Sequence, residues 1–255
     1  MSSIPQDPVI RVENLTAGYG GNTILEGVSF TVNRGEILCI VGRSGCGKST
    51  LLKQMIGLYK PFHGRVLING IDIHAVGEHE LRHVRTGFGV LFQSGSLFGS
   101  MTLEENVALP IHEYSDLPPD LVALIVKMKL GLVNLVGYEA YLPSELSGGM
   151  KKIAGLARAM ALDPDILFFD EPSTGLDPVT SAELDRTIRN INEGMGTTMV
   201  IVSHELASIL NIAHRIVVLD EDAKGIIAEG DPKGLLDRTT DRRVRNFLTR
   251  QVSKD

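Results

Sequence analysis

A glycine-rich segment that carries a lysine and two hydroxyl residues offers the clearest chemistry in this sequence. It reads Gly42-Arg-Ser-Gly45-Cys-Gly47-Lys48-Ser49-Thr50. Glycines let the backbone turn so tightly that successive N–H groups face inward toward phosphate oxygens. The lysine of such a loop supplies positive charge to the β- and γ-phosphates, and the following hydroxyl ligates Mg²⁺. The predicted nucleotide-binding residues are Gly42, Ser44, Gly45, Cys46, Gly47, Lys48, Ser49 and Thr50.

Two adjacent carboxylates follow a short apolar run later in the chain. Asp170 and Glu171 come directly after Ile166-Leu-Phe-Phe169. A buried strand that ends in carboxylates suits a nucleotide site of an α/β protein. Asp170 is then predicted to hold Mg²⁺, and Glu171 to act as the general base on the attacking water. A solvated turn before Pro172 is the alternative, and the phosphate loop upstream argues against it.

A histidine and a glutamine also follow apolar runs. His204 comes after Met199-Val-Ile-Val-Ser203, and Gln93 comes after Gly89-Val-Leu-Phe92. A histidine at a strand end can contact a γ-phosphate, although a lone histidine is commonly structural. Gln93 is predicted to orient water and Mg²⁺, so the predicted catalytic residues are Lys48, Gln93, Glu171 and His204.

The elements that position these residues are predicted from apolar patterning. Strands alternate with helices, which predicts a parallel sheet covered on both faces. Between Leu103 and Met160 the apolar spacing is mostly helical, with an interruption expected at Pro110. This block reads as a helical insertion into the α/β core. The predicted strands are Val9–Leu15, Val28–Val32, Ile37–Val41, Arg65–Ile68, Ile166–Phe169, Met199–Val202 and Ile216–Leu219.

Length, charge and cysteine content argue against some classes of function. The chain has 255 residues, is 43% hydrophobic and carries a formal net charge of −6 at pH 7, which argues against a broadly basic nucleic-acid binder. Its two cysteines, Cys39 and Cys46, are too few for a disulfide framework and indicate a reducing compartment. The first thirty residues lack an apolar signal-peptide core, and the predicted location is the cytoplasm.

Taken together, these motifs resemble the ATP-binding cassette (ABC) ATPases over almost the whole chain. Leu146-Ser-Gly-Gly-Met150 and Ser173-Thr-Gly-Leu-Asp177 complete the set in the family's order. The resemblance implies an ATPase that uses ATP and Mg²⁺. It also implies an α/β fold of the P-loop NTPase class, with a RecA-like parallel-sheet core, an N-terminal antiparallel β subdomain and an inserted α-helical subdomain. The predicted parts are a nucleotide-binding core at 1–93 and 161–230, a helical subdomain at 94–160 and a helical tail at 231–255.

The same resemblance implies that two copies share each site. Ser147, Gly148 and Gly149 are then ligands to ATP held by a second copy in a head-to-tail dimer, because a Ser-Gly-Gly turn at a helix start exposes N–H groups. One phosphate loop and one signature per chain make a homodimer the simplest assembly. Asp177 would couple the two sites. Tyr19 matches the aromatic that stacks on adenine, or is an ordinary surface tyrosine.

Three segments narrow the resemblance to the ATPases of MCE-type lipid transporters, such as the maintenance-of-lipid-asymmetry system. They are Leu91–Phe98, the signature ending in Met150, and Asp241–Leu248. The resemblance implies phospholipid transport through an integral membrane permease, with an MCE-type lipid-binding protein and a small regulatory subunit as further partners. The chain would then lie at the cytoplasmic face of the inner membrane. Met150 stands at the end of the signature, where glutamine is commoner in the family. Because the side chain at this position is not the one expected to donate to phosphate, the difference need not impair hydrolysis.

Two segments allow two interpretations each. The loop with Gly95, Leu97, Phe98 and Met101 could receive the permease or pack internally. The tail from Asp231 to Asp255 holds seven Lys or Arg residues and four Asp. It is interpreted as an amphipathic helix that packs on the core through Val244, Phe247 and Leu248, in preference to a lipid-headgroup site.

Other functions remain open at this stage. A small-solute importer would share every catalytic residue and differ in its permease. A soluble ABC protein acting on nucleic acid or ribosomes usually carries two cassettes or long inserted arms, and this chain has neither. A non-catalytic cassette would not be expected to keep Lys48, Asp170, Glu171 and His204.

Overall fold

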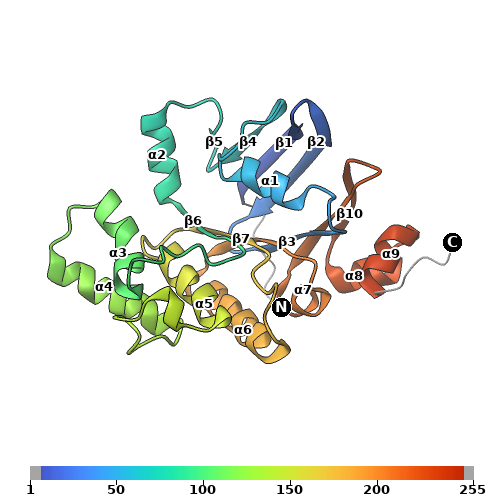
Figure 1. Cartoon of the computed structure of the whole chain (residues 1–255). Helices are drawn as coiled ribbons and strands as arrows, with labels where there is room; N and C mark the ends of the chain where they lie inside the picture. Colours follow the sequence, from blue (N-terminus) through green and yellow to red (C-terminus); the bar gives the residue numbers. More distant parts are fainter. Residues whose placement is uncertain (1–6, 250–255) are drawn as a thin grey trace.

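The computed structural model describes residues 7–249 as two β-sheets with helices between and around them (Figure 1). The first six residues and the last six, which include Arg250 of the predicted tail, lie outside the described part. In the described part no helix is long and apolar enough to cross a membrane.

The larger sheet has six strands in the order β10-β9-β3-β8-β7-β6. All neighbours in it are parallel except β10, which pairs antiparallel with β9. Every residue of the central strand β3 is buried, because helices or strands cover both faces. The strands are β3 (Ile37–Gly42), β6 (Phe88–Leu91), β7 (Ile166–Asp170), β8 (Thr198–Val202), β9 (Arg215–Asp220) and β10 (Gly225–Gly230).

Side chains of β3 alternate between two hydrophobic cores, as the period of a strand requires. Cys39 and Val41 join the core beneath the sheet, whereas Leu38 and Ile40 join the core above it. The upper core is closed by a four-stranded antiparallel sheet in the order β2-β1-β4-β5. Helix α1 (Lys48–Met55) packs between the two sheets. The strands of the smaller sheet are β1 (Pro8–Tyr19), β2 (Asn22–Asn33), β4 (His63–Ile68) and β5 (Ile71–Asp72).

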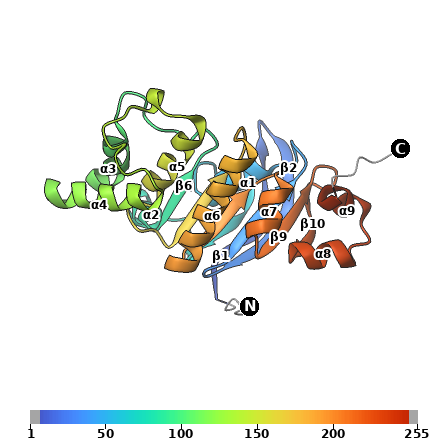
Figure 2. The same ribbon diagram turned by 90° about the horizontal axis from the view of Figure 1, so that it is seen from below.

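Helices cover the other face of the large sheet and extend beyond both of its ends. Helices α5, α6 and α7 lie against the sheet, α3 and α4 lie at one end, and α8 and α9 lie at the opposite end (Figures 1 and 2). The bounds are α2 (Glu78–Thr86), α3 (Leu103–Tyr114), α4 (Pro119–Leu132), the 3₁₀ turn η1 (Pro143–Glu145), α5 (Gly148–Ala159), α6 (Pro178–Met195), α7 (Leu206–Ile212), α8 (Pro232–Arg238) and α9 (Arg242–Thr249).

The predicted α/β class, parallel core, antiparallel β layer and helical insertion are confirmed, and one local prediction is wrong. Pro110 was expected to interrupt the helical pattern, yet it lies inside α3. A proline removes one backbone donor and strains the preceding turn. Burial of Val107 and Ile111 on either side outweighs that cost, so the helix continues through the proline.

Candidate functional site

The phosphate loop connects the end of β3 to the start of α1, as the motif requires. Gly42, Gly45 and Gly47 have φ values of 150°, 91° and 98°, a region that favours glycine. Space is also short at two of them. A Cβ on Gly42 would lie 2.4 Å from the carbonyl oxygen of Leu219, and one on Gly47 would lie 2.9 Å from the Ile24 side chain. The loop therefore requires glycine at all three positions for conformation, and at Gly42 and Gly47 for packing as well.

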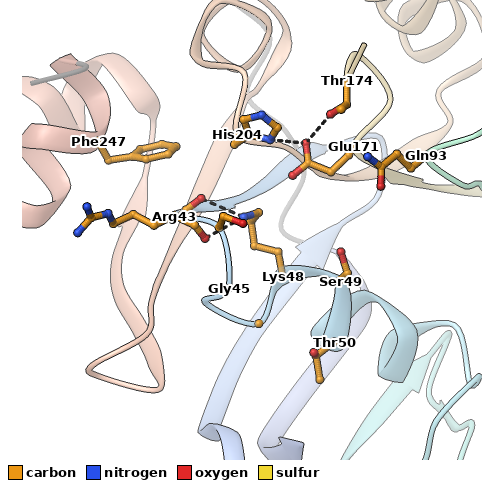
Figure 3. A pocket seen from close by; sticks show the side chains of 13 residues that line it. Arg43, Gly45, Lys48, Ser49, Thr50, Gln93, Glu171, Thr174, His204 and Phe247 are labelled. Carbon is orange, nitrogen blue, oxygen red and sulfur yellow. Dashed lines mark hydrogen bonds and ion pairs between the residues drawn. The ribbon is translucent and has the colours of Figure 1, made fainter. Parts of the chain in front are cut away.

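The side chain of Lys48 reaches back into the phosphate loop. Its side chain is buried, and its Nζ donates hydrogen bonds of 3.0 Å to the carbonyl oxygens of Gly42 and Arg43 (Figure 3). The ammonium group is thus already in the concave side of the loop, where phosphate oxygens would lie. A charge placed in a partly desolvated loop of backbone N–H groups is suited to a phosphate.

Ser49 and Asp170 meet beside the loop. The Ser49 hydroxyl donates a 2.9 Å hydrogen bond to Asp170 Oδ1, and Asp170 is the last residue of β7. Burial raises the pKa of Asp170, and the hydrogen bond from Ser49 opposes that rise. A hydroxyl and a carboxylate are hard oxygen donors of the kind that Mg²⁺ takes together with substrate phosphates. No cluster of three His, Cys, Asp or Glu side chains that could hold a metal occurs within residues 7–249, so the phosphates would have to complete such a site.

Glu171 and His204 form the second polar pair. His204 Nδ1 lies 2.7 Å from Glu171 Oε2, and Thr174 Oγ1 donates to the same oxygen over 3.3 Å. The Glu171 side chain is 13% exposed and the His204 side chain is 55% exposed. Glu171 has a φ of 50°, in the left-handed region, and its N–H donates to the carbonyl of Val202. The carboxylate is therefore held beside the loop with one oxygen fixed by two partners.

The phosphate loop, Glu171 and His204 line one pocket with a volume of about 660 Å³. Gln93 lies at one side of it in Figure 3, with Arg43 and Phe247 at the other. The pocket brings together ten of the predicted residues. They are Gly42, Ser44, Gly45, Gly47, Lys48, Ser49, Thr50, Gln93, Glu171 and His204.

Six predicted ligands lie outside the lining of this pocket, namely Asp170, Cys46, Tyr19 and the three signature residues described below. Asp170 does not line the pocket, but it accepts the hydrogen bond from Ser49, which does. The Cys46 side chain is buried in the upper core, and burial raises the pKa of its thiol. Tyr19 ends β1 and is 41% exposed, with its ring edge-on to Tyr59 at 5.7 Å between centroids.

The signature residues lie at the N-terminus of α5 and do not line the pocket. Ser147 is the N-cap, and its Oγ accepts a 3.2 Å hydrogen bond from the N–H of Met150. Gly148 is exposed, whereas Gly149 is buried where a Cβ would lie 2.5 Å from the Thr180 side chain of α6. The N-terminus of α5 thus lies outside the pocket that the phosphate loop of the same chain lines. Asp177, predicted to couple sites, is the N-cap of α6 and accepts from the N–H groups of Val179 and Thr180.

Sequence reasoning missed three residues that line the pocket. Arg43 and Thr174 stand inside the recognised motifs, but the motifs assign them no contact, so only the folded structure shows that they line the pocket. Phe247 comes from α9, far along the chain, where its spacing with Val244 and Leu248 indicated only a packing face. Nothing in the sequence pairs α9 with the phosphate loop.

Comparisons with known proteins agree with this geometry. The family described as ABC transporter matches residues 25–174. The chain is 43% identical to the intermembrane phospholipid transport ATP-binding protein MlaF of Haemophilus influenzae, over 94% of this chain and 90% of that protein. It is 45% identical to the probable ribonucleotide transport ATP-binding protein mkl of Mycobacterium tuberculosis, over 83% of this chain and 58% of that protein.

A solved structure shares the fold. The ATP-binding cassette MJ0796, a dimer in a post-hydrolysis state bound to ADP and Pi, superposes with a TM-score of 0.79 and is 30% identical. The match covers 87% of this chain and 98% of that one. The chain therefore belongs to the ABC transporter family as one of its ATP-binding, ATP-hydrolysing cassettes.

Proposed function

We propose that this chain is the ATP-hydrolysing subunit of a transporter that moves phospholipid between membranes through a separate permease. The observation that carries the proposal is the coincidence of a pocket that brings together Lys48, Glu171 and His204 with 43% identity to MlaF over 94% of the chain. Phospholipid is what that relative's name specifies. The pocket itself supports ATP hydrolysis and does not discriminate among transported substrates.

The proposed mechanism assigns roles to residues in and beside the pocket. The loop N–H groups and Lys48 bind the β- and γ-phosphates. Ser49, Asp170 and Gln93 would hold Mg²⁺, which when bound neutralises charge on the β- and γ-phosphate oxygens. Glu171 accepts a proton from the attacking water, and His204 keeps the carboxylate oriented through the 2.7 Å contact. Tyr19 is proposed to stack on adenine from the edge of the small sheet.

A second copy completes the site in this proposal. Ser147, Gly148 and Gly149 bind the γ-phosphate of ATP on the partner cassette, which is consistent with their absence from the pocket of their own chain. The related cassette MJ0796 is dimeric in its ADP- and Pi-bound structure, which supports a head-to-tail pair. ATP binding then favours the closed dimer, because only that state gives each nucleotide its second wall of contacts. Release after hydrolysis lets the dimer open and moves the permease.

The proposed assembly places the chain at the cytoplasmic face of the inner membrane. Its partners are an integral membrane permease, an MCE-type lipid-binding protein and a small regulatory subunit, and nucleic acid is not among them. The net charge of −6 supports the last point.

A small-solute importer is the second candidate, favoured by the 45% identity to mkl, which is named as a ribonucleotide transport protein. The two candidate functions can be separated by purifying the tagged chain with its native partners in mild detergent. Mass spectrometry then identifies the small molecules bound to the complex. Phospholipid in the complex, together with ATP-dependent transfer of labelled phospholipid between vesicles, is the expected result. A complex that retains ribonucleotide or another solute and transfers no lipid would contradict the proposal.

A further inference from the structure

A buried lysine links the signature helix to the turn that follows Glu171. Lys152 lies on α5 and is 6% exposed. Its Nζ donates hydrogen bonds to the carbonyl oxygens of Pro172 and Thr174, at 2.7 and 2.5 Å. Burial lowers the pKa of Lys152, and the charge of Glu171 partly offsets this. A lysine that is buried in this way is stable only with such acceptors around it.

The turn that Lys152 contacts also positions the carboxylate of Glu171. Thr174 Oγ1 donates to Glu171 Oε2 over 3.3 Å, and the Thr174 N–H donates to the Glu171 carbonyl over 3.3 Å. The hydroxyl of Ser173, in the middle of the turn, is buried and has no hydrogen-bond partner within residues 7–249. The two hydrogen bonds from Lys152 thus tie this turn to α5.

Helix α5 reaches from this anchor to the signature. Ser147 caps the helix five positions before Lys152, a distance of under two helical turns. The N-terminus that is proposed to bind the partner's ATP and the residue that holds the turn of Glu171 are thus parts of one short rigid helix.

We propose that Lys152 is a positioning residue, which fixes Glu171 relative to the signature helix so that engagement of the partner's ATP by Ser147 sets the base of the chain's own site. This inference rests on the proposed function. Displacement of a catalytic group by about 1 Å can lower a rate about 100-fold. Loss of Lys152 is therefore expected to act on the chemical step and to leave ATP binding intact.

The test compares three lysine variants of the full chain by steady-state ATP hydrolysis and by binding of a fluorescent ATP analogue. Lys152→Met keeps the aliphatic volume and removes the donors, and Lys152→Arg keeps them. The matched control is Lys129→Met, since Lys129 is 4% exposed and forms an ion pair with Asp163, away from Glu171. We expect kcat of Lys152→Met to fall about 10- to 100-fold with KM for ATP within about twofold. Lys152→Arg should restore most of kcat, and Lys129→Met should keep it.

A purely structural role predicts a different result. Lys152→Met would then lose thermal stability as Lys129→Met does, with kcat unchanged, and the inference would fail. A parallel rise of KM would also overturn it, because binding would then be what was lost. If Lys152→Met does not fold, Lys152→Gln repeats the test with a shorter donor.

Glu171→Gln separates this inference from the proposed function. If that variant hydrolyses ATP at the normal rate, Glu171 is not the base and the inference about Lys152 falls, while the proposed transport ATPase stands. If Glu171→Gln is inactive while Lys152→Met turns over normally, the inference alone fails.

Discussion

Glu171, the proposed base, is held in place by contacts from several directions. Its φ of 50° is unfavourable for a residue with a side chain, and the surrounding contacts maintain it. The backbone N–H is tied to Val202, and the carboxylate is tied to His204 and Thr174. Strain that is compensated by neighbouring contacts is typical of catalytic positions.

Glu171→Gln is expected to retain ATP binding and to lose turnover by a factor of about 100 or more, because the amide cannot accept the proton of the attacking water. Steady-state hydrolysis and binding of a fluorescent ATP analogue measure the two properties separately. Hydrolysis equal to that of the unaltered chain would remove Glu171 from the role of base.

Lys48→Ala is expected to act earlier, on nucleotide binding. The alanine removes the ammonium from the loop while the carbonyls of Gly42 and Arg43 remain. A hydrogen bond to a charged group contributes about 1.5–3 kcal/mol, so the Kd for ATP should rise by about 10- to 100-fold. Titration calorimetry with ATP checks this, and an unchanged Kd would mean that the lysine does not contact the phosphates.

At the scale of elements, prediction worked where a motif and an apolar strand adjoin. The strands before Gly42, Asp170 and His204 were each predicted from short apolar runs, and all three lie side by side in the large sheet. Their carboxyl ends therefore meet at one edge, as parallel strands require. The predicted division into 1–93 with 161–230, 94–160 and 231–255 stays a prediction.

Prediction failed where tertiary packing decides the outcome. Pro110 looked like a helix break, but buried neighbours keep α3 continuous. Phe247 looked like one member of a packing face, and Val244 and Leu248 on the same helix are indeed buried. The position of α9 beside the phosphate loop depends on long-range contacts such as Arg243 with Asp220, which no local pattern reveals.

The contact between α5 and the loop after Gln93 gives a prediction at this scale. A Cβ on Gly155 of α5 would lie 2.8 Å from the carbonyl oxygen of Gly95, so Gly155→Ala should lower the free energy of unfolding by about 1–3 kcal/mol. Gly131→Ala in α4 is the matched control. Its added methyl would lie 3.7 Å from Val136, and it should raise stability by about 0.5–1 kcal/mol. Urea unfolding distinguishes the two, and equal effects would show that α5 does not pack closely on the loop.

At the scale of the whole molecule, the proposal assigns two half-sites to one chain, the phosphate-loop pocket and the N-terminus of α5. The phosphate loop, Glu171 and His204 share a pocket, and the N-terminus of α5 lies outside it. In a closed two-fold dimer, the signature of each copy would meet the phosphate loop of the other copy. Both sites would then be completed, and no half-site would stay unpaired. The central claim is therefore that ATP joins two copies through Ser147 and its neighbours.

The molar mass of the Glu171→Gln chain by light scattering, with and without Mg·ATP, tests this claim most directly. Because the variant binds ATP without consuming it, the closed pair should accumulate at twice the 27.7 kDa of one chain. Adding Ser147→Arg to the same chain should return the mass to that of a single copy. A single-chain mass at saturating Mg·ATP, or a dimer that Ser147→Arg leaves intact, would contradict the account.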